Sequence, residues 1–342
     1  MSDTEYDEPP LSPRDRIDAR AADRRRRRRL TRSVAAGVAV AVAVLLIPLS
    51  CRPQQSGPFV AIAVGGMACD PTDPEFHDGQ GAEGWCRQQA VSDLARSLSP
   101  RVLLGLGDYQ YELPARSAYS DVYDPSWGQL RDITRPALGN QELKVFRANT
   151  FRSYFGDLAG PERGYWSFDE GNWHVVVLNS NCTTVVGGCL TGSPQQLWLE
   201  DDLASSGARC TIALWHHPRF SNGIMGPDQR TKDLWATLRG HDVEMVLSAH
   251  EHHYERFPRL DENGRGDERG PRQFIAGTGG QVAYHPKEGD APWRQKLTPT
   301  ASEAVDFDHL GVLELTLDTT SYSWRFVTLD GSVTDQGADD CH

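Results

Sequence analysis

The sequence predicts an α/β domain in which strands and helices alternate to form layers, and three observations lead to this prediction. The chain has 342 residues, of which 39% are hydrophobic and 24% charged, as in an ordinary globular protein. Short apolar runs alternate with helical patterns along most of it, which is typical of layered α/β domains. The C-terminal part carries a hairpin pattern instead, so we expect part of the sheet to be antiparallel.

Six short apolar runs are predicted to be buried strands. They are rich in Val, Ile and Leu, and residues such as Gly, Asp, Asn or His follow them. The runs are Phe59–Val64, Val102–Leu106, His174–Leu178, Thr211–Trp215, Val243–Leu247 and Phe274–Ala276. The tail from Leu310 to Leu329, with the polar stretch DTTSYS in its middle, predicts the hairpin.

Three segments between these runs are predicted to be helices. Residues 87–98 place five apolar side chains on one helix face: Ala90, Val91, Leu94, Ala95 and Leu98. A second helix begins at Ser193 as N-cap, with Pro194 in the first turn and Gln196 three residues after the cap. Gly207 lies just beyond its expected end. The third helix is expected over Asp228 to Leu238.

The N-terminal residues are predicted to be a targeting region rather than part of the fold. Residues 1–32 form a basic, disordered arm, and its six consecutive arginines, Arg24 to Arg29, are expected to keep it in the cytoplasm. Residues 33–51 are almost wholly apolar, which fits a signal peptide, a lipoprotein signal or a membrane anchor, with a linker at 52–57. Cys51, after LIPLS, resembles a lipoprotein cleavage site and is a candidate for lipidation. We therefore expect an extracytoplasmic domain, secreted or anchored to the outer face of the cell membrane.

The remaining six cysteines support export independently. An even number of cysteines in an exported chain indicates disulfides. The close pairs Cys69/Cys86 and Cys182/Cys189 suggest local staples, which leaves Cys210 to pair with Cys341. A zinc cluster is disfavoured because the chain contains no CxxC motif.

The charge of the exported part excludes one class of partner. Residues 33–342 hold 25 basic and 40 acidic groups, a net charge of −15. Such a surface repels polyanions, so we expect no nucleic-acid partner. The sequence leaves the oligomeric state open.

Polar side chains follow three of the predicted strands and a fourth strand end, after the stretch ITRPAL, and sites form at such ends in α/β sheets. The motifs are GDYQY with Asp108 and Tyr111, GNQE with Asn140, HHP with His216, and AHEH with His250 and His252. If the last strand continued, its period of two would place His250 and His252 on one face and His253 on the other. Carboxylate, phenolate, carboxamide and imidazole groups are together ligands for Zn, Mn or Fe, and Asp108 can bridge two metals.

In their order along the chain, these motifs resemble those of the calcineurin-like metallophosphoesterases. The GDxxY spacing and the HYER stretch after the histidines make the chain most similar to purple acid phosphatases, in a compact bacterial form, over residues 58–342. The resemblance implies a four-layer α-β-β-α sandwich of two mixed sheets with helices outside. It also implies attack of a metal-bound hydroxide on a small phosphorylated substrate.

The resemblance further implies two metal sites that share Asp108. Asn140, His216 and His250 complete the second site, while Tyr111 and His252 belong to the first site. The ions expected are divalent or trivalent Fe, Zn or Mn.

Two positions depart from the family pattern. Gly66 stands where the family has a metal-binding Asp of the first site, and Asp70 is not expected to replace it. Gln141 stands where the family usually has a catalytic His, and a carboxamide cannot donate a proton near neutral pH. Ala249 in place of the usual Gly is a smaller change. We therefore expect one firmly bound metal at the second site and a weak one at the first.

The sequence thus favours an exported metal-dependent phosphoesterase of reduced activity. The leading alternative is an inactive metallophosphatase fold that binds a phosphorylated ligand or a partner, and a third is a protein that keeps the fold for structure alone. His217 and His253 are left without an assigned role. The substrate, the metal and the pH optimum remain open.

Overall fold

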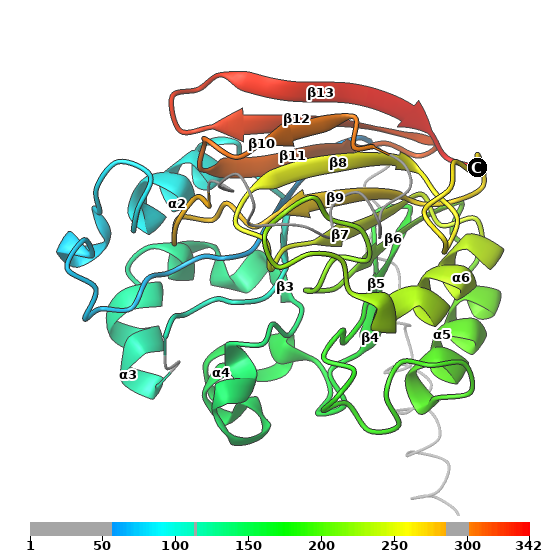
Figure 1. Ribbon diagram of the computed structural model, residues 1–342, viewed down its shortest axis with the longest axis horizontal. Coiled ribbons are helices and arrows are strands. Elements are labelled where there is room, and N and C mark those ends of the chain that lie inside the picture. The colour runs from blue at the N-terminus through cyan, green and yellow to red at the C-terminus, as the bar shows by residue number, and fades with distance from the viewer. Residues whose placement is uncertain (1–56, 113–114, 285–300) are drawn as a thin grey trace, which may run out of the picture. The chain divides into compact units, whose positions relative to one another are not determined.

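The computed structural model describes residues 57–112, 115–284 and 301–342, which belong to one unit built around two β-sheets (Figure 1). The predicted arm at 1–32, the apolar segment at 33–51 and all but the last residue of the linker at 52–57 lie outside the described residues. Their assignments therefore stay predictions.

The first sheet has six strands among the described residues, in the order β13-β12-β11-β1-β2-β3. They are β1 (Phe59–Val64), β2 (Val102–Gly105), β3 (Thr134–Pro136), β11 (Gly311–Leu317), β12 (Ser321–Thr328) and β13 (Val333–Asp340). β1, β2 and β3 run parallel, and the C-terminal strands β11, β12 and β13 join them antiparallel, as the hairpin pattern predicted. The sequence did not predict β13, because it is a mostly exposed edge strand with no apolar run.

The second sheet has seven strands in the described part of the chain, in the order β10-β8-β9-β7-β6-β5-β4. They are β4 (Trp166–Glu170), β5 (Trp173–Val177), β6 (Cys210–Leu214), β7 (Met245–Ser248), β8 (Tyr254–Arg259), β9 (Arg272–Ala276) and β10 (Ala304–Asp306). The four inner strands β5, β6, β7 and β9 are parallel, whereas β4, β8 and β10 are antiparallel to their neighbours. Both sheets are therefore mixed.

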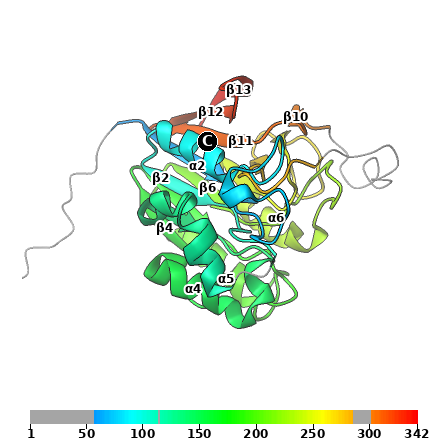
Figure 2. The same cartoon turned by 90° about the vertical axis from the view of Figure 1, so that its left-hand side faces the viewer.

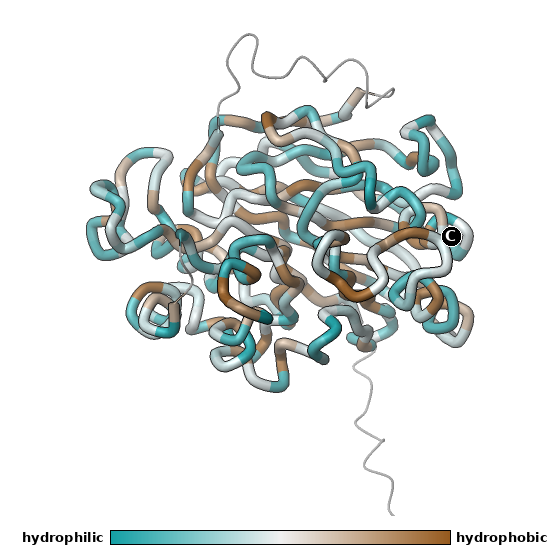
Figure 3. Tube along the Cα trace, turned by 60° about the horizontal axis from the view of Figure 1, so that its bottom comes forward, coloured by the Kyte–Doolittle hydropathy of each residue, from teal (hydrophilic) through white to brown (hydrophobic). Residues whose placement is uncertain are grey.

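Buried side chains on both faces of each sheet form the core. In β1, Ala61 and Ala63 belong to the cluster between the two sheets, together with Val175 of β5. The alternate residues Ile62 and Val64 belong to a second cluster on the outer face of the first sheet. This burial explains why the inner strands are continuous apolar runs. Figure 3 shows hydrophobic chain concentrated in the interior strands and hydrophilic chain in many outer loops.

Helices cover the outer faces of the sheets. They are α2 (Gln88–Ser97), α3 (Arg116–Ala118), α4 (Asn149–Phe155), α5 (Pro194–Ser205) and α6 (Lys232–Gly240), with a π-helix at Tyr119–Tyr123 and short 3₁₀ turns. The 3₁₀ turns span His77–Gly79, Trp127–Ile133, Glu142–Lys144, Phe146–Ala148, Gly156–Ala159 and Gln229–Thr231. α2 and α4 pack on the first sheet, and α5 and α6 pack on the second (Figures 1 and 2). The predicted four-layer sandwich is confirmed.

The helix signals are also found where the sequence predicted them. Ser193 caps α5, its Oγ accepting a hydrogen bond from the Gln196 backbone N–H at 3.3 Å, and Pro194 is the first helical residue. α6 begins at Lys232, four residues later than predicted, because a 3₁₀ turn occupies residues 229–231. Among the described helices, none combines the length and apolar character needed to span a membrane.

Three disulfides join the six cysteines of the described unit in the predicted pairs. Cys69–Cys86 and Cys182–Cys189 close short loops of 17 and 7 residues. Cys210–Cys341 ties the start of β6 to the C-terminal end of the chain, across 131 residues. The long link restrains the C-terminal edge of the first sheet against the second.

The histidines after β7 lie in a loop rather than a strand. β7 ends at Ser248, and His250 adopts a left-handed backbone conformation with φ of 66°. The period-two argument for His250, His252 and His253 is therefore wrong, since it holds only for extended chain. The turn at His250 decides where these three side chains point.

Candidate metal centre

The six predicted ligands converge at the carboxyl ends of four strands. Asp108 follows β2 and Asn140 follows β3 in the first sheet, while His216 follows β6 and His250 and His252 follow β7 in the second. Tyr111 lies in the same loop as Asp108. Because the carboxyl ends of both sets of parallel strands meet at one edge of the sandwich, residues more than 140 positions apart in the chain become neighbours.

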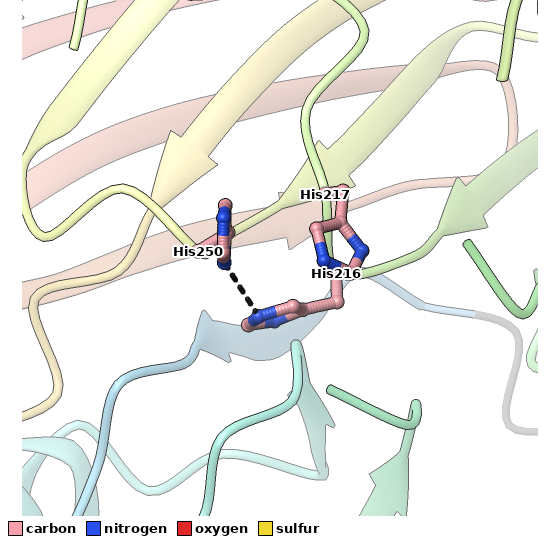
Figure 4. A group of neighbouring side chains, drawn as sticks. All are labelled: His216, His217 and His250. Carbon is pink, nitrogen blue, oxygen red and sulfur yellow. Dashed lines mark hydrogen bonds between the residues drawn. The ribbon is translucent and has the colours of Figure 1, made fainter. Parts of the chain in front are cut away.

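The second site centres on His216. Its Nε2 lies 2.9 Å from Asn140 Oδ1, 3.3 Å from Asp108 Oδ2 and 3.2 Å from His250 Nδ1. Figure 4 shows the His250 ring directed toward a ring nitrogen of His216, with the two ring planes 72° apart. The His216 ring and the Asp108 carboxylate are almost completely removed from solvent, and His250 is partly buried. The structure thus brings all four predicted ligands of the second site together.

The hydrogen bonding of His216 tests whether this set fits a metal ion. Its Nδ1 lies 2.8 Å from the Leu106 carbonyl oxygen, which can only accept, so the proton of the neutral ring is on Nδ1. In this neutral ring Nε2 is an acceptor, and it faces two further acceptors, the carboxamide oxygen of Asn140 and the carboxylate of Asp108. A cation must lie among these atoms, either a proton or a metal ion. The set therefore fits a metal.

The charges of the second site follow from the same arrangement. Burial lowers the pKa of His216, but the Asp108 carboxylate outweighs burial and holds this pKa above its ordinary value. Burial and the neighbouring His216 lower the pKa of His250 to about 3. Burial also opposes ionisation of Asp108, yet His216 and the Gln141 N–H keep its pKa below the usual range. Asp108 is thus a carboxylate and His250 a neutral imidazole, which are the protonation states that bind metals.

The first site is less complete. The Tyr111 hydroxyl donates to Asp108 Oδ2 at 2.8 Å and lies 3.0 Å from His252 Nε2. Tyr284 stacks on the His252 ring with their centroids 4.6 Å apart. The three predicted ligands are therefore in contact, but Gly66 adds no ligand to them.

The backbone at Gly66 shows what a side chain there would meet. A Cβ at this position would lie 3.7 Å from His252 Cδ2, on the side of the first site, and 2.7 Å from the Gly277 carbonyl oxygen. The φ of 64° is left-handed, which most side chains adopt only with strain. Asp70 does not take its place, since its carboxylate binds Thr72 and the Glu112 backbone.

Glu142 holds the two loops of the first sheet together, a role that the sequence did not reveal. Its buried carboxylate accepts hydrogen bonds from the backbone N–H groups of Asp108, Tyr109 and Gly139, at 3.0, 2.9 and 2.8 Å. Burial and the nearby Asp108 charge raise its pKa to about 7. The sequence did contain one signal for this role: Glu142 is an acidic residue two positions after the candidate ligand Asn140, just beyond a buried strand.

Gln141 lies beside the second site. Its backbone N–H donates to Asp108 Oδ1 at 2.9 Å. Its side chain is only 7% exposed, and the buried Oε1 meets no hydrogen-bond donor within the described part of the chain. A free amide oxygen beside the candidate ligands leaves a place for a bound donor or cation.

The two histidines without an assigned role differ from each other. His217 lies against the second site, with its ring centroid 4.5 Å from that of His250 and 4.9 Å from that of His216 (Figure 4). His253 turns away, its Nε2 3.1 Å from Glu255 and its ring beside Phe307. His253 thus points away from the site, as the sequence predicted, although a turn and not a strand puts it there; the position of His217 is seen only in the folded structure.

Comparisons with known proteins agree with this geometry. Residues 86–254 match the model of the calcineurin-like phosphoesterase family. Purple acid phosphatase 22 of Arabidopsis thaliana is 28% identical over 203 residues, which are 51% of this chain and 44% of that protein. A 3',5'-cyclic-nucleotide phosphodiesterase of Nostoc is 33% identical over 91 residues, 25% of this chain and 34% of its own. The chain spans less than half the length of the curated relatives that it matches.

Solved structures support the fold. A purple acid phosphatase from yellow lupin aligns with a TM-score of 0.61 at 17% identity, over 84% of this chain and 54% of that one. GAP50 of Plasmodium aligns with a TM-score of 0.57 at 12% identity, over 84% of this chain and 90% of its own. The family match over residues 86–254, the relatives and the shared fold together support a metallophosphoesterase of the purple acid phosphatase type.

Proposed function

We propose that the chain is a metal-dependent phosphoesterase that hydrolyses phosphomonoesters, with reduced turnover. The observation that carries the proposal is the convergence of Asp108, Asn140 and His250 on His216 Nε2, at 3.3, 2.9 and 3.2 Å, because this mixture of oxygen and nitrogen atoms suits a metal ion. Zn, Mn and Fe are the ions that this mixture of imidazole, carboxylate and carboxamide groups suits. A bound metal would supply Lewis-acid charge for a phosphate oxygen and lower the pKa of water.

The chain's own residues supply position and hydrogen bonds. Leu106 and Glu142 fix the orientation of His216 and of the Asp108 loop, so the ligands are held before substrate arrives. Gln141 lies beside Asp108 and can hydrogen-bond a phosphate oxygen, but its amide cannot protonate a leaving group. Together with the missing carboxylate at Gly66, this is the physical reason to expect slow turnover.

A simple assay tests the proposal. The purified chain, loaded in turn with Zn²⁺, Mn²⁺ and Fe, is incubated with an aryl phosphate, and product is followed in wild type and in His250→Ala. We expect slow hydrolysis that needs metal and is lost in the variant. Turnover of about 10 s⁻¹ in wild type, an ordinary enzyme value, would contradict reduced activity.

Binding without turnover is the second candidate function. The fold match to GAP50 favours it, because the solved structure of that protein is described as the anchor in the inner membrane complex of Plasmodium. Gln141 and Gly66 favour it too, because they replace the catalytic His and the metal-binding Asp that the resemblance implies, while the ligands of the second site are kept. Metal-loaded wild type that binds inorganic phosphate but hydrolyses no aryl phosphate would establish this candidate instead.

We also propose that the domain works outside the cytoplasm, on a small phosphorylated substrate and without nucleic acid. Three disulfides in one unit support an oxidising compartment. Membrane attachment through the N-terminal segment is tested by Cys51→Ser: release from membranes supports lipidation, and continued attachment supports a retained anchor. Several free thiols in denatured, unreduced protein would contradict export.

A further inference from the structure

We propose that His217 is a third imidazole ligand of the second site, which makes this site a three-histidine centre for one borderline transition-metal ion such as Zn²⁺. The inference rests on the proposed metal dependence and names the ion class and an added ligand. It starts from geometry: one ring nitrogen from each of His216, His217 and His250 lies within 4.8 Å of the others. Figure 4 shows the three rings gathered around one space.

The distance between two of these rings suits two ligands of one ion. Two neighbouring nitrogens that each lie about 2.0 to 2.1 Å from a Zn²⁺ ion are roughly 3 to 3.5 Å apart. His216 Nε2 and His250 Nδ1 are 3.2 Å apart. No hydrogen-bond pair needs this convergence of three imidazoles, because each ring offers one donor and one acceptor at most when neutral.

Ser180 fixes the ring of His217. Its buried Oγ lies 2.9 Å from His217 Nδ1 and also accepts the His217 backbone N–H at 2.9 Å. With Nδ1 turned toward the serine, Nε2 is the nitrogen left for a metal. The arrangement parallels that of His216, whose Nδ1 is bonded to the Leu106 carbonyl. An outer partner on the second ring nitrogen is what orients metal-binding histidines in general.

The third imidazole changes which ion the site prefers. Without His217 the second site offers two nitrogens and the oxygens of Asp108 and Asn140, which also suits Mn²⁺. Three imidazoles favour Zn²⁺, Co²⁺ or Cu²⁺ over oxygen-preferring ions. In this proposal the first site lacks the carboxylate that Gly66 cannot offer, whereas the second site gains the imidazole nitrogen of His217.

Metal binding without substrate tests this, so the result does not depend on turnover. The purified full-length chain is titrated with Zn²⁺ against a chelator, in wild type, His217→Ala, Ser180→Ala and the control His241→Ala. His241 is bonded to Glu200 outside the site. We expect Ser180→Ala to lose roughly 10- to 100-fold in Zn²⁺ affinity, His217→Ala to lose more than Ser180→Ala, and the control to lose nothing.

A second measurement covers the case in which His217→Ala does not fold. Wild type loaded with Co²⁺ is examined by X-ray absorption, and the imidazoles around the ion are counted. Three imidazoles support the proposal. The proposal is overturned by any of three results. These are two imidazoles around the ion, a Zn²⁺ affinity of His217→Ala within twofold of wild type, and wild type that binds no Zn²⁺. Equal affinities with metal-dependent hydrolysis intact would overturn the role of His217 alone.

Discussion

The two candidate metal sites share Asp108 but differ in which contacts hold their residues in place. The second site takes its ligands from four strand ends in both sheets, and backbone groups fix them, as the Leu106 carbonyl fixes His216. The first site depends on Tyr111 in the loop after β2, on His252 in the loop after β7 and on position 66, where Gly66 offers no ligand. One substitution can therefore disable the first site while the second stays intact. We therefore expect each candidate site to be able to lose its metal without the other.

The largest effect is expected from restoring both altered positions. In Gly66→Asp/Gln141→His, a carboxylate returns to the first site and a titratable group returns beside the phosphate, and such acid catalysis typically contributes about 10² to 10⁴ in rate. We expect each single change to gain little and the double variant much more than their product, because they act as one unit. Steady-state hydrolysis of an aryl phosphate measures this.

The matched control is Gly66→Ala/Gln141→His, which fills position 66 without a carboxylate. It should stay near the rate of the single Gln141→His variant. A double Asp/His variant that holds two metals and remains inert would end the enzyme proposal and leave the binding function.

Ligand removal gives the next largest effect and compares the two sites directly. His250→Ala removes a ligand of the second site, so we expect it to lose metal by more than the 10- to 100-fold that a lost outer partner costs. His252→Ala alters the first site alone and should keep close to one tightly bound metal per chain. The metal content per chain is measured for both variants after dialysis. Equal losses of metal would show that the two sites do not differ.

Side chains at position 66 are expected to cost stability. Gly66→Ala places a Cβ 2.7 Å from the Gly277 carbonyl oxygen at a left-handed φ, a strain of about 1 to 3 kcal/mol. Gly66→Asp should lose less in the presence of metal than in its absence, because a new ligand offsets the strain. Urea unfolding with and without Zn²⁺ measures the difference. An unchanged unfolding free energy in Gly66→Ala would show that the loop moves freely.

The smallest expected effect is on the pH dependence of stability, and it comes from His174, which belongs to neither candidate site. His174, early in β5, lies 2.8 Å from Asp169 and 2.9 Å from Asp202; burial lowers its pKa, but the two carboxylates outweigh burial and raise it. The folded state thus binds the proton more tightly, so this stabilisation is complete below about pH 6.5 and is lost as pH rises through the raised pKa. His174→Gln should reduce the slope of the urea unfolding free energy between pH 5.5 and 8.5 by this contribution, and a slope equal to that of wild type would contradict the prediction.

Much of the fold and of the site could be predicted from the sequence for local reasons. Buried strands are apolar on both faces, so runs such as Phe59–Val64 are visible, and the Ser193 cap and the cysteine spacing are short-range signals. Polar residues at strand ends, such as Asp108 and Asn140, could be found because parallel strands bring those ends together. These features depend on neighbours within a few residues.

Only the tertiary structure decided the rest. The left-handed turn at His250 follows β7, and in the folded structure the His250 ring lies beside that of His217, which follows β6, a contact that no side-chain period describes. Glu142 gains its role from backbone groups about 30 residues away, and the crowding at Gly66 comes from a carbonyl more than 200 residues later. The sequence by itself determined which chemical groups stand at the strand ends. Packing of the two sheets decided which of them meet, because those contacts join segments that are far apart in the chain.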